Sequence, residues 1–385
     1  MNEAAMRRHV KIVCTLGPAS NSPEVVERML KEGMNVARFN LAYGTLEEHS
    51  QLISEVRSIS RKLELTTGIL LDLPGLKRSR GDIESVFGPH LEFAIKKNVD
   101  FVALSFITSA RQVLEVKQLL GKMKADIPII VKIEQAKALE ESGAILDDGE
   151  GIMVARGDLA LDISIEKVPM AQKKLIREAN RRGKPVITAT QMLESMVRSA
   201  SPTRAEATDV ANAVLDGTDA LMLSEETTIG SYPVEAVEMM VKIALEAEAM
   251  FPYEETLRSE RQDVLSAVND ATARAVCQMA YHVQARAIVA FTSGGTTALR
   301  VSKYRPRYPI LAVTPSASVV SRLSLAWGVL PLRRPEPTNI EEVFNLASKA
   351  TVEVGLAKKG DLIVIIAGIP LAVPGSTNLV KIHSV

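Results

Sequence analysis

The chain has 385 residues, of which 24% are charged and 46% are hydrophobic, a composition typical of a globular protein with room for two domains. Its 46 basic and 46 acidic residues give a formal net charge of zero, which argues against nucleic acid and membrane surfaces as partners. The two cysteines, Cys14 and Cys277, form neither a metal motif nor a disulfide framework, and no segment reads as a signal peptide or bilayer span, so we expect a cytoplasmic protein.

Eight short runs of apolar and β-branched residues recur in the first two thirds of the chain, and amphipathic segments typical of helices separate them. Eight strands, each followed by a helix, over roughly 250 residues predict a (β/α)8 TIM barrel, which we place at residues 1–250. An open doubly wound sheet is the alternative that the same pattern allows. The runs are 11–17, 34–40, 68–73, 100–106, 127–134, 151–158, 184–190 and 219–226.

Polar side chains gather at the carboxyl ends of these runs. A barrel brings those ends to one mouth, where enzymes with this fold keep their chemistry, whereas an open sheet spreads them along an edge. The pattern therefore favours the barrel and predicts an active site at its mouth. The polar residues are Arg38, Asn40, Asp72, Ser105, Lys132, Glu134, Arg156, Asp158, Thr190, Gln191, Ser224 and Glu226.

The residue types at this mouth indicate a metal and an anion. Glu134 and Asp158 follow neighbouring strands and offer hard oxygen ligands that suit Mg²⁺ or Mn²⁺ better than zinc. Lys132 and Arg38 are cations that can face a carboxylate, a phosphate or an enolate, and Gly157 lets backbone amides approach a ligand. Together these groups can stabilise an enolate. The alternative is that Lys132 and Glu134 form a simple ion bridge.

A second set of strand-like runs follows a break in the pattern near Phe251. Helical segments separate these runs, so we expect a smaller C-terminal α/β domain over residues 251–385. The runs are 285–295, 308–314, 327–332, 361–368 and 377–385.

Long stretches of the sequence resemble pyruvate kinases, over almost the whole chain. The resemblance implies a glycolytic phosphotransferase that converts phosphoenolpyruvate and ADP to pyruvate and ATP with Mg²⁺ or Mn²⁺, and that assembles as a homotetramer. The matching stretches include KIVCTLGPAS, GMNVARFN, GIMVARGDL, GKPVITATQMLESM, SPTRAEATDVANAVLDGTDALMLSEET, KYRPRYPILAVT and PGSTNLVKIHSV.

The resemblance implies roles for individual residues at the mouth. Lys132 resembles the lysine that stabilises the enolate, and Glu134 and Asp158 resemble the ligands of the catalytic divalent metal. Thr190 resembles the threonine near the face where the enolate is protonated, and Arg38 resembles the arginine that faces the transferred phosphoryl group. We therefore expect Lys132, Thr190 and Arg38 to be the catalytic residues.

The resemblance also implies a substrate-binding loop, whose backbone holds the carboxylate of phosphoenolpyruvate. This loop follows the sixth predicted strand, and the threonine that follows the seventh strand faces it. The implied substrate-binding residues are Ala155, Arg156, Gly157, Asp158 and Thr190.

A potassium site of the family is only partly present. Asn40 and Asp72 match two of its members, but Ala42 stands where the family has serine and Leu73 stands where it has threonine. Lys77 falls where potassium-independent members carry a lysine whose charge substitutes for the ion. Other departures lie on the nucleotide and phosphate side, at Arg78 or Arg80, Thr108 and Glu225.

A glycine-rich segment of the second domain, TSGGTT, resembles the phosphate-gripping loop of an allosteric sugar-phosphate site. Its amides and hydroxyls can form a nest for an anion, although a plain strand-to-helix turn has the same composition. The implied effector residues are Thr292, Ser293, Gly294, Gly295, Thr296 and Thr297.

The family's inserted lid domain, about a hundred residues long and far longer than an ordinary βα loop, has no counterpart near residues 78–84. Because the lid closes over the nucleotide, its absence removes contacts to ADP or ATP and the means of excluding water. Three interpretations follow. The first is a lidless pyruvate kinase of reduced activity. The second is a metal-dependent enolate enzyme that uses no nucleotide, such as an oxaloacetate decarboxylase or an aldolase. The third is a non-catalytic paralogue that binds a phosphorylated metabolite or regulates a complete kinase.

Overall fold

The eight predicted strands form one closed parallel barrel, which confirms the TIM-type fold and excludes the open sheet. β1 pairs with β2 on one side and with β8 on the other, so the sheet has no free edge. Because all strands run in the same direction, their carboxyl ends meet at one mouth. The strands are β1 (Lys11–Thr15), β2 (Val36–Asn40), β3 (Gly68–Leu73), β4 (Phe101–Leu104), β5 (Ile129–Ile133), β6 (Gly151–Ala155), β7 (Val186–Ala189) and β8 (Ala220–Leu223).

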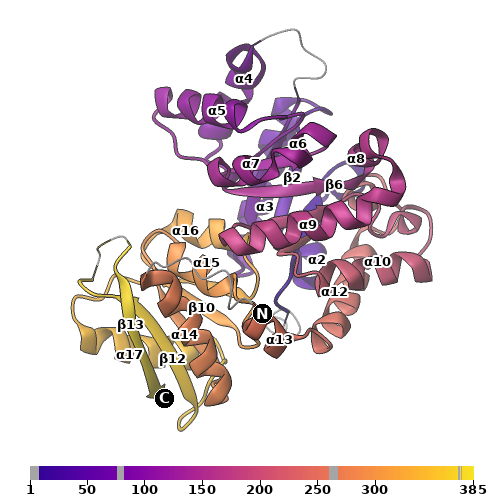
Figure 1. Ribbon diagram of the computed structural model, residues 1–385. Coiled ribbons are helices and arrows are strands. Elements are labelled where there is room, and N and C mark those ends of the chain that lie inside the picture. The colour runs from indigo at the N-terminus through magenta and orange to yellow at the C-terminus, as the bar shows by residue number, and fades with distance from the viewer. Residues whose placement is uncertain (1–7, 76–81, 260–267, 372, 374) are drawn as a thin grey trace. The chain divides into compact units, whose positions relative to one another are not determined.

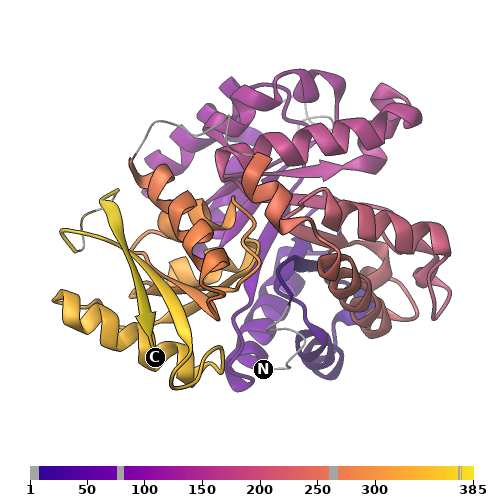
Figure 2. The same cartoon turned by 60° about the horizontal axis from the view of Figure 1, so that its bottom comes forward.

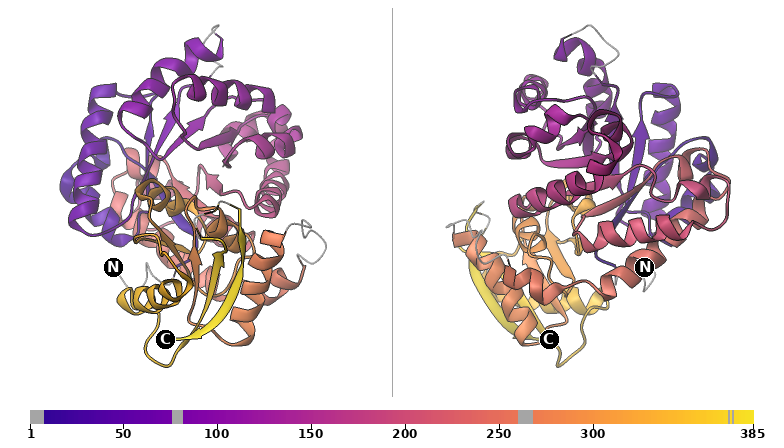
Figure 3. Two further views of the ribbon diagram at one scale, coloured as in Figure 1. Left: turned by 90° about the vertical axis from the view of Figure 1, so that its left-hand side faces the viewer. Right: turned by 45° about the vertical axis from the view of Figure 1, so that its right-hand side comes forward.

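Helices surround the strands of this barrel (Figure 3). The computed structural model describes residues 8–75, 82–259, 268–371, 373 and 375–385. Among the described residues, no helix has the length and apolar character needed to cross a bilayer. The barrel helices are α2 (Pro23–Glu32), α3 (Leu46–Lys62), α4 (Ile83–Lys96), α5 (Ala110–Lys122), α6 (Ala136–Glu140), α7 (Ser142–Asp148), α8 (Arg156–Ile163), α9 (Val168–Arg182), α10 (Arg204–Leu215), α11 (Glu225–Thr228) and α12 (Pro233–Ala249).

Local sequence signals set the ends of these helices. The Ser22 side chain accepts the Val25 amide hydrogen bond at the start of α2, as the Ser-Pro-Glu sequence predicts. Reciprocal caps from Thr45 and Thr203 begin α3 and α10. α9 ends at Gly183, which adopts a left-handed φ of +65° that glycine accepts without strain.

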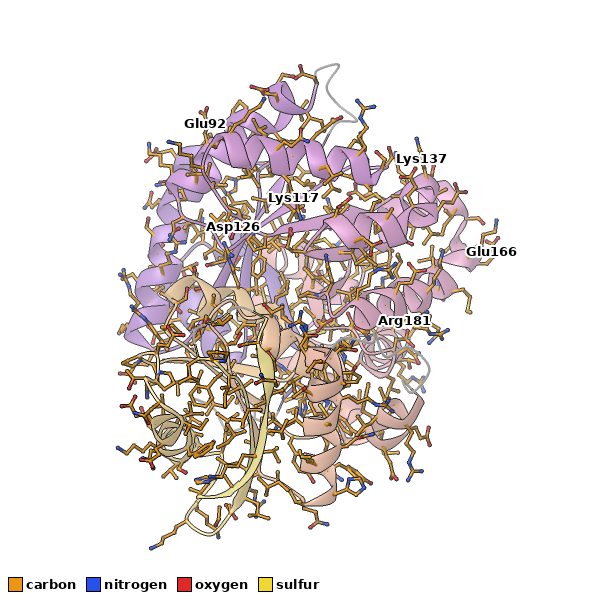
Figure 4. All side chains as sticks on the ribbon, turned by 60° about the vertical axis from the view of Figure 1, so that its left-hand side comes forward. Glu92, Lys117, Asp126, Lys137, Glu166 and Arg181 are labelled. Atoms are coloured by element: carbon orange, nitrogen blue, oxygen red, sulfur yellow. The ribbon has the colours of Figure 1, made fainter. Side chains whose placement is uncertain are left out.

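The inner and outer faces of the strands explain why they read as continuous apolar runs. β1, β3 and β6 are buried along their whole length, because side chains fill the barrel on one face and helices cover the other. Charged side chains such as Glu92, Lys137 and Glu166 project outward from the ribbon of the helical layer instead (Figure 4). Most residues inside these strands are therefore apolar.

The connection between β3 and α4 consists of residues 74–82 only. This segment is far too short for an inserted domain, which needs its own hydrophobic core. Lys77, Arg78 and Arg80 lie within it but outside the described residues.

The chain divides into two compact units, Met1–Met250 and Phe251–Val385. The second unit contains a five-stranded sheet in the order β11-β10-β9-β12-β13, in which only β13 is antiparallel. Figure 2 shows the long strands β12 and β13 side by side. The strands are β9 (Ala287–Phe291), β10 (Ile310–Thr314), β11 (Val329–Arg333), β12 (Leu362–Gly368) and β13 (Thr377–Ser384), and the helices are α13 (Tyr253–Ser259), α14 (Val268–His282), α15 (Thr296–Ser302), α16 (Ala317–Arg322) and α17 (Ile340–Glu353).

Each face of this second sheet is covered by different helices. On β9, Ile288 and Ala290 belong to a core cluster that includes residues of α14, α15 and α16. The alternating residues Val289 and Phe291 belong to a second cluster, which includes residues of α17. This alternation follows from the two-residue period of a strand and gives the unit three layers.

Candidate active site

Four charged side chains meet at the mouth of the barrel, from the ends of β2, β3 and β5. The Lys132 Nζ atom lies 2.8 Å from Glu134 Oε1 and 3.4 Å from Asp72 Oδ2. Arg38 donates to the same Asp72 oxygen through Nε at 3.0 Å and Nη2 at 2.6 Å. The predicted gathering of Lys132, Glu134, Arg38 and Asp72 therefore occurs, and their formal charges balance.

Burial and pairing set the protonation states of this cluster. Burial alone would raise the pKa of Asp72, but the Lys132 and Arg38 cations outweigh it and hold that pKa below its usual value. Burial would likewise lower the pKa of Lys132, yet the Asp72 and Glu134 carboxylates raise it. Burial raises the pKa of Glu134, against the opposing effect of Lys132. Lys132 thus remains an ammonium ion at neutral pH, able to face a substrate anion.

Ser105, at the end of β4, connects two of these charges. Its hydroxyl accepts a hydrogen bond from Lys132 Nζ at 2.8 Å and donates to Asp72 Oδ1 at 3.1 Å. The Thr15 hydroxyl accepts from Arg38 Nη1 at 2.6 Å. The sequence marked Ser105 only as a polar strand end, and nothing in it pointed to Thr15 as a partner of Arg38.

The residues present fit a divalent metal ion. Glu134 Oε2 accepts the Phe106 amide at 2.6 Å, whereas the buried Oε1 atom pairs with the Lys132 ammonium at 2.8 Å. Asp158 is half-buried in the first turn of α8, directly after the adjacent strand β6. Among the described residues, no cluster of three or more metal-ligating side chains occurs, so two carboxylates with water and substrate oxygens would complete the shell, as Mg²⁺ prefers.

The same region is poorly suited to a potassium ion. Asn40 Oδ1 accepts the Ala42 amide at 3.2 Å, and Ala42 and Leu73 contribute no side-chain oxygen. Both Asp72 oxygens already accept hydrogen bonds from the protein. Lys77, the expected substitute charge, lies outside the described residues.

The expected carboxylate-binding loop and Thr190 lie against each other. The Gly157 amide donates to Thr190 Oγ1 at 2.9 Å, which joins the start of α8 to the end of β7. Ala155 is the N-cap residue of α8 and provides no side-chain cap, and backbone amides at a helix N-terminus suit an anion. The Arg156 side chain instead extends toward α10, where its Nη1 atom lies 2.6 Å from Asp209 Oδ2. No feature of the sequence indicated this partner.

In the second unit, the glycine-rich segment lines a cavity of about 140 Å³. Thr292, Ser293, Gly294, Thr296 and Thr297 contribute to its wall. Gly295 forms the N-cap of α15 with a φ of +86°, which is the turn that the sequence predicts between strand and helix. Two arginines and one acidic residue also line the cavity: Arg300, Arg334 and Glu336.

Comparison with known proteins gives one consistent result. A family model described as pyruvate kinase, barrel domain, matches residues 7–86 and 87–237, and one described as pyruvate kinase, alpha/beta domain, matches residues 270–383. Pyruvate kinases of Staphylococcus aureus strains USA300, NCTC 8325 / PS 47 and COL are each 37% identical to the chain over 471 aligned positions, which cover 98% of this chain and 80% of the relative. Because the alignment is longer than the 385-residue chain, the relatives carry residues that this chain lacks. The barrel match breaks close to the β3–α4 connection.

Proposed function

The chain belongs to the pyruvate kinase family of phosphotransferases, and on that premise we propose that it transfers a phosphoryl group between phosphoenolpyruvate and ADP, giving pyruvate and ATP. The observation that carries the proposal is the Lys132 ammonium held 2.8 Å from Glu134 Oε1 at the barrel mouth. A fixed cation next to a carboxylate that can ligate a metal ion suits the stabilisation of an enolate. The intact loop at Gly157 supports the same substrate.

The proposed reaction breaks the bond between phosphorus and the enol oxygen and forms a bond from phosphorus to a terminal phosphate oxygen of ADP. The enolate then takes a proton at its methylene carbon, on the face where Thr190 lies, and becomes pyruvate. Lys132 offsets the negative charge on the enolate oxygen, while Arg38 faces the phosphoryl group. A divalent ion held by Glu134 and Asp158 would, when bound, supply further positive charge at that oxygen. The amides at the start of α8 hold the carboxylate.

Two features support a reduced rate and a relaxed ion requirement. The connection of residues 74–82 provides no lid to retain ADP, so we propose weak nucleotide binding. The Asp72 carboxylate is already paired with protein cations, so we propose that the reaction needs no potassium ion.

The test compares two reactions of the purified protein with Mg²⁺. Pyruvate and ATP should form from phosphoenolpyruvate and ADP, and Lys132→Met should lower kcat by about 10³-fold because the enolate loses its cation. Lys117→Met is the matched control, since Lys117 pairs with Glu150 at 2.5 Å on the outside of the barrel and should leave kcat unchanged. Pyruvate release from oxaloacetate without nucleotide, together with no ATP formation, would favour the enolate enzyme instead.

The second unit supports a separate proposal, that its cavity binds a phosphorylated sugar as an effector. The glycine-rich wall and the two arginines suit a phosphate group. Glucose 6-phosphate and ribose 5-phosphate, tested one at a time, should raise the melting temperature, and Thr292→Ala should remove that increase. Stabilisation that persists in Thr292→Ala would place the phosphate elsewhere. Following the family, we further propose that the chain forms homotetramers, which light scattering measures directly.

A further inference from the structure

The turn after β7 is conformationally strained. Thr190 and Gln191 have φ angles of +69° and +54°, in the left-handed region that side chains other than glycine rarely occupy. Two such residues in succession persist only where their surroundings hold them. Because Thr190 belongs to the proposed substrate site, whatever holds this turn also sets the geometry of that site.

Arg156 stabilises the strained turn through two hydrogen bonds. Its Nε atom donates to the carbonyl oxygen of Ala189 at 3.2 Å and its Nη2 atom donates to the carbonyl oxygen of Thr190 at 2.7 Å. These carbonyls stand on either side of the first strained residue, so the planar guanidinium fixes the peptide units around it. The side chain is only 11% exposed, which leaves little room for it to reorient.

Asp209 in turn holds Arg156 from α10. Its carboxylate oxygens lie 2.6 and 2.8 Å from Arg156 Nη1, and Gln172 Oε1 of α9 accepts from the same nitrogen at 3.3 Å. Figure 1 shows α8, α9 and α10 along one side of the barrel. Without the carboxylate, the guanidinium would lose its strongest partner and would hold the two carbonyl groups less firmly.

We propose that Asp209 is a positioning residue for the substrate carboxylate. It fixes Arg156 against the turn, and the turn places the Thr190 hydroxyl beside the Gly157 amide, where that hydroxyl accepts a hydrogen bond at 2.9 Å. The inference rests on the proposed function, because that function assigns the carboxylate to this loop. The proposal also gives a role to the stretch SPTRAEATDVANAVLDG, which contains Asp209 and otherwise has no part in the proposed mechanism.

The experiment measures oxalate binding by calorimetry in the presence of Mg²⁺, alongside steady-state kinetics. Oxalate is a planar dianion similar to enolpyruvate and needs no nucleotide. Asp209→Asn should raise the oxalate Kd and the KM for phosphoenolpyruvate by about tenfold, and leave the KM for ADP within about twofold. Asp147→Asn is the matched control, since Asp147 pairs with Arg182 at 2.8 Å on the barrel exterior and should change none of these values.

A rescue variant separates positioning from a general loss of stability. Glycine adopts a positive φ without strain, so Gln191→Gly reduces the need for the turn to be held. Added to Asp209→Asn, it should return the oxalate Kd to within about threefold of the wild-type value. A purely structural role for Asp209 predicts a lower melting temperature, an unchanged oxalate Kd and no rescue, and that result overturns the proposal.

Arg156→Lys provides an independent route if Asp209→Asn does not fold. A lysine keeps the charge near Asp209 but lacks the fork that reaches both carbonyl groups, so the oxalate Kd should rise as in Asp209→Asn. Wild-type affinity for oxalate in either folded variant overturns the inference. Oxalate binding by wild-type protein that forms no ATP overturns the proposed function alone, because the variants still report on the turn.

Discussion

At the scale of single residues, Asp72 is a buried carboxylate whose charge is balanced by protein cations. Its carboxylate accepts hydrogen bonds from Arg38 and Ser105, lies 3.4 Å from the Lys132 ammonium, and is almost completely buried. A monovalent cation would compete with these partners for the Asp72 oxygens. The mouth therefore carries a balanced set of charges before any substrate or metal binds.

Replacing KCl by tetramethylammonium chloride at equal ionic strength should change the rate of pyruvate formation by less than about twofold. The physical reason is that Ala42 and Leu73 supply no side-chain oxygen and that Asp72 is already paired. The melting temperature should also be the same in the two salts. A potassium-specific rise in either quantity would show that the ion binds despite the missing oxygens.

Lys11, at the amino end of β1, links stability to pH. Burial, reinforced by Arg8 and opposed by Glu248 and Asp219, lowers its pKa from 10.5 to about 7. The unfolded chain therefore binds more protons between about pH 7 and pH 10, and stability rises with pH there by at most about 1.4 kcal/mol per pH unit. Below this window both states are protonated and the slope vanishes.

Lys11→Met should accordingly stabilise the protein most at pH 7, and the gain should shrink as the pH approaches 10. The measurement is the difference in the free energy of unfolding between variant and wild type, by urea denaturation at several pH values. Lys31→Met, at an exposed ion pair with Glu27, should give a small difference without this trend. A gain that is constant across pH would mean that Lys11 is not neutral in the folded protein.

At the scale of elements, the sequence predicted most where a physical constraint acts on neighbouring residues. β3 and β6 were evident because barrel strands are buried on both faces and read as continuous apolar runs. The start of α2 was evident because Ser22 and Pro23 are local signals. The Arg156–Asp209 pair joins positions far apart in sequence, and no periodicity encodes which way a long side chain turns. The positive φ angles of the two residues after β7 could not be predicted from the sequence either, because neither residue is glycine.

Gly75, in the connection between β3 and α4, lies close against the residues that follow β4. A Cβ atom at Gly75 would lie 2.3 Å from Phe106 Cδ2 and 2.9 Å from the Ser105 carbonyl oxygen, so Gly75→Ala must displace this segment. Ser105 accepts a hydrogen bond from Lys132, and the Phe106 amide donates one to Glu134. Displacing these residues should therefore lower kcat by about tenfold. The free energy of unfolding should fall by about 1–3 kcal/mol.

Gly121→Ala is the matched control for this substitution. Its Cβ atom would meet nothing within 4 Å, in helix α5, so the change should leave kcat unaltered and raise stability by up to about 1 kcal/mol. An unchanged kcat in Gly75→Ala would show that a change at Gly75 does not alter the positions of Lys132 and Glu134.

At the scale of the whole molecule, the chain keeps both family domains while the connection where the lid would be inserted is short. The pyruvate kinase relatives align over more positions than this chain contains, and residues 74–82 alone join β3 to α4. The groups proposed for the enolate, at the ends of β5 and β6, come from the barrel itself. A catalytic centre that is open on the nucleotide side should therefore retain its chemistry but lose control over which acceptor receives the phosphoryl group.

Water is the acceptor that a lid normally excludes, so we expect phosphoenolpyruvate to be partly hydrolysed to pyruvate and inorganic phosphate. Pyruvate formed should exceed ATP formed in the same reaction, and the excess should fall as ADP is raised, because ADP and water compete for one phosphoryl group. The measurement is the ratio of the two products with Mg²⁺ present, with the Staphylococcus aureus enzyme, which is longer than this chain, as the comparison at a ratio near one. A ratio of one at low ADP would show that the chain excludes water from the phosphoryl group without a lid.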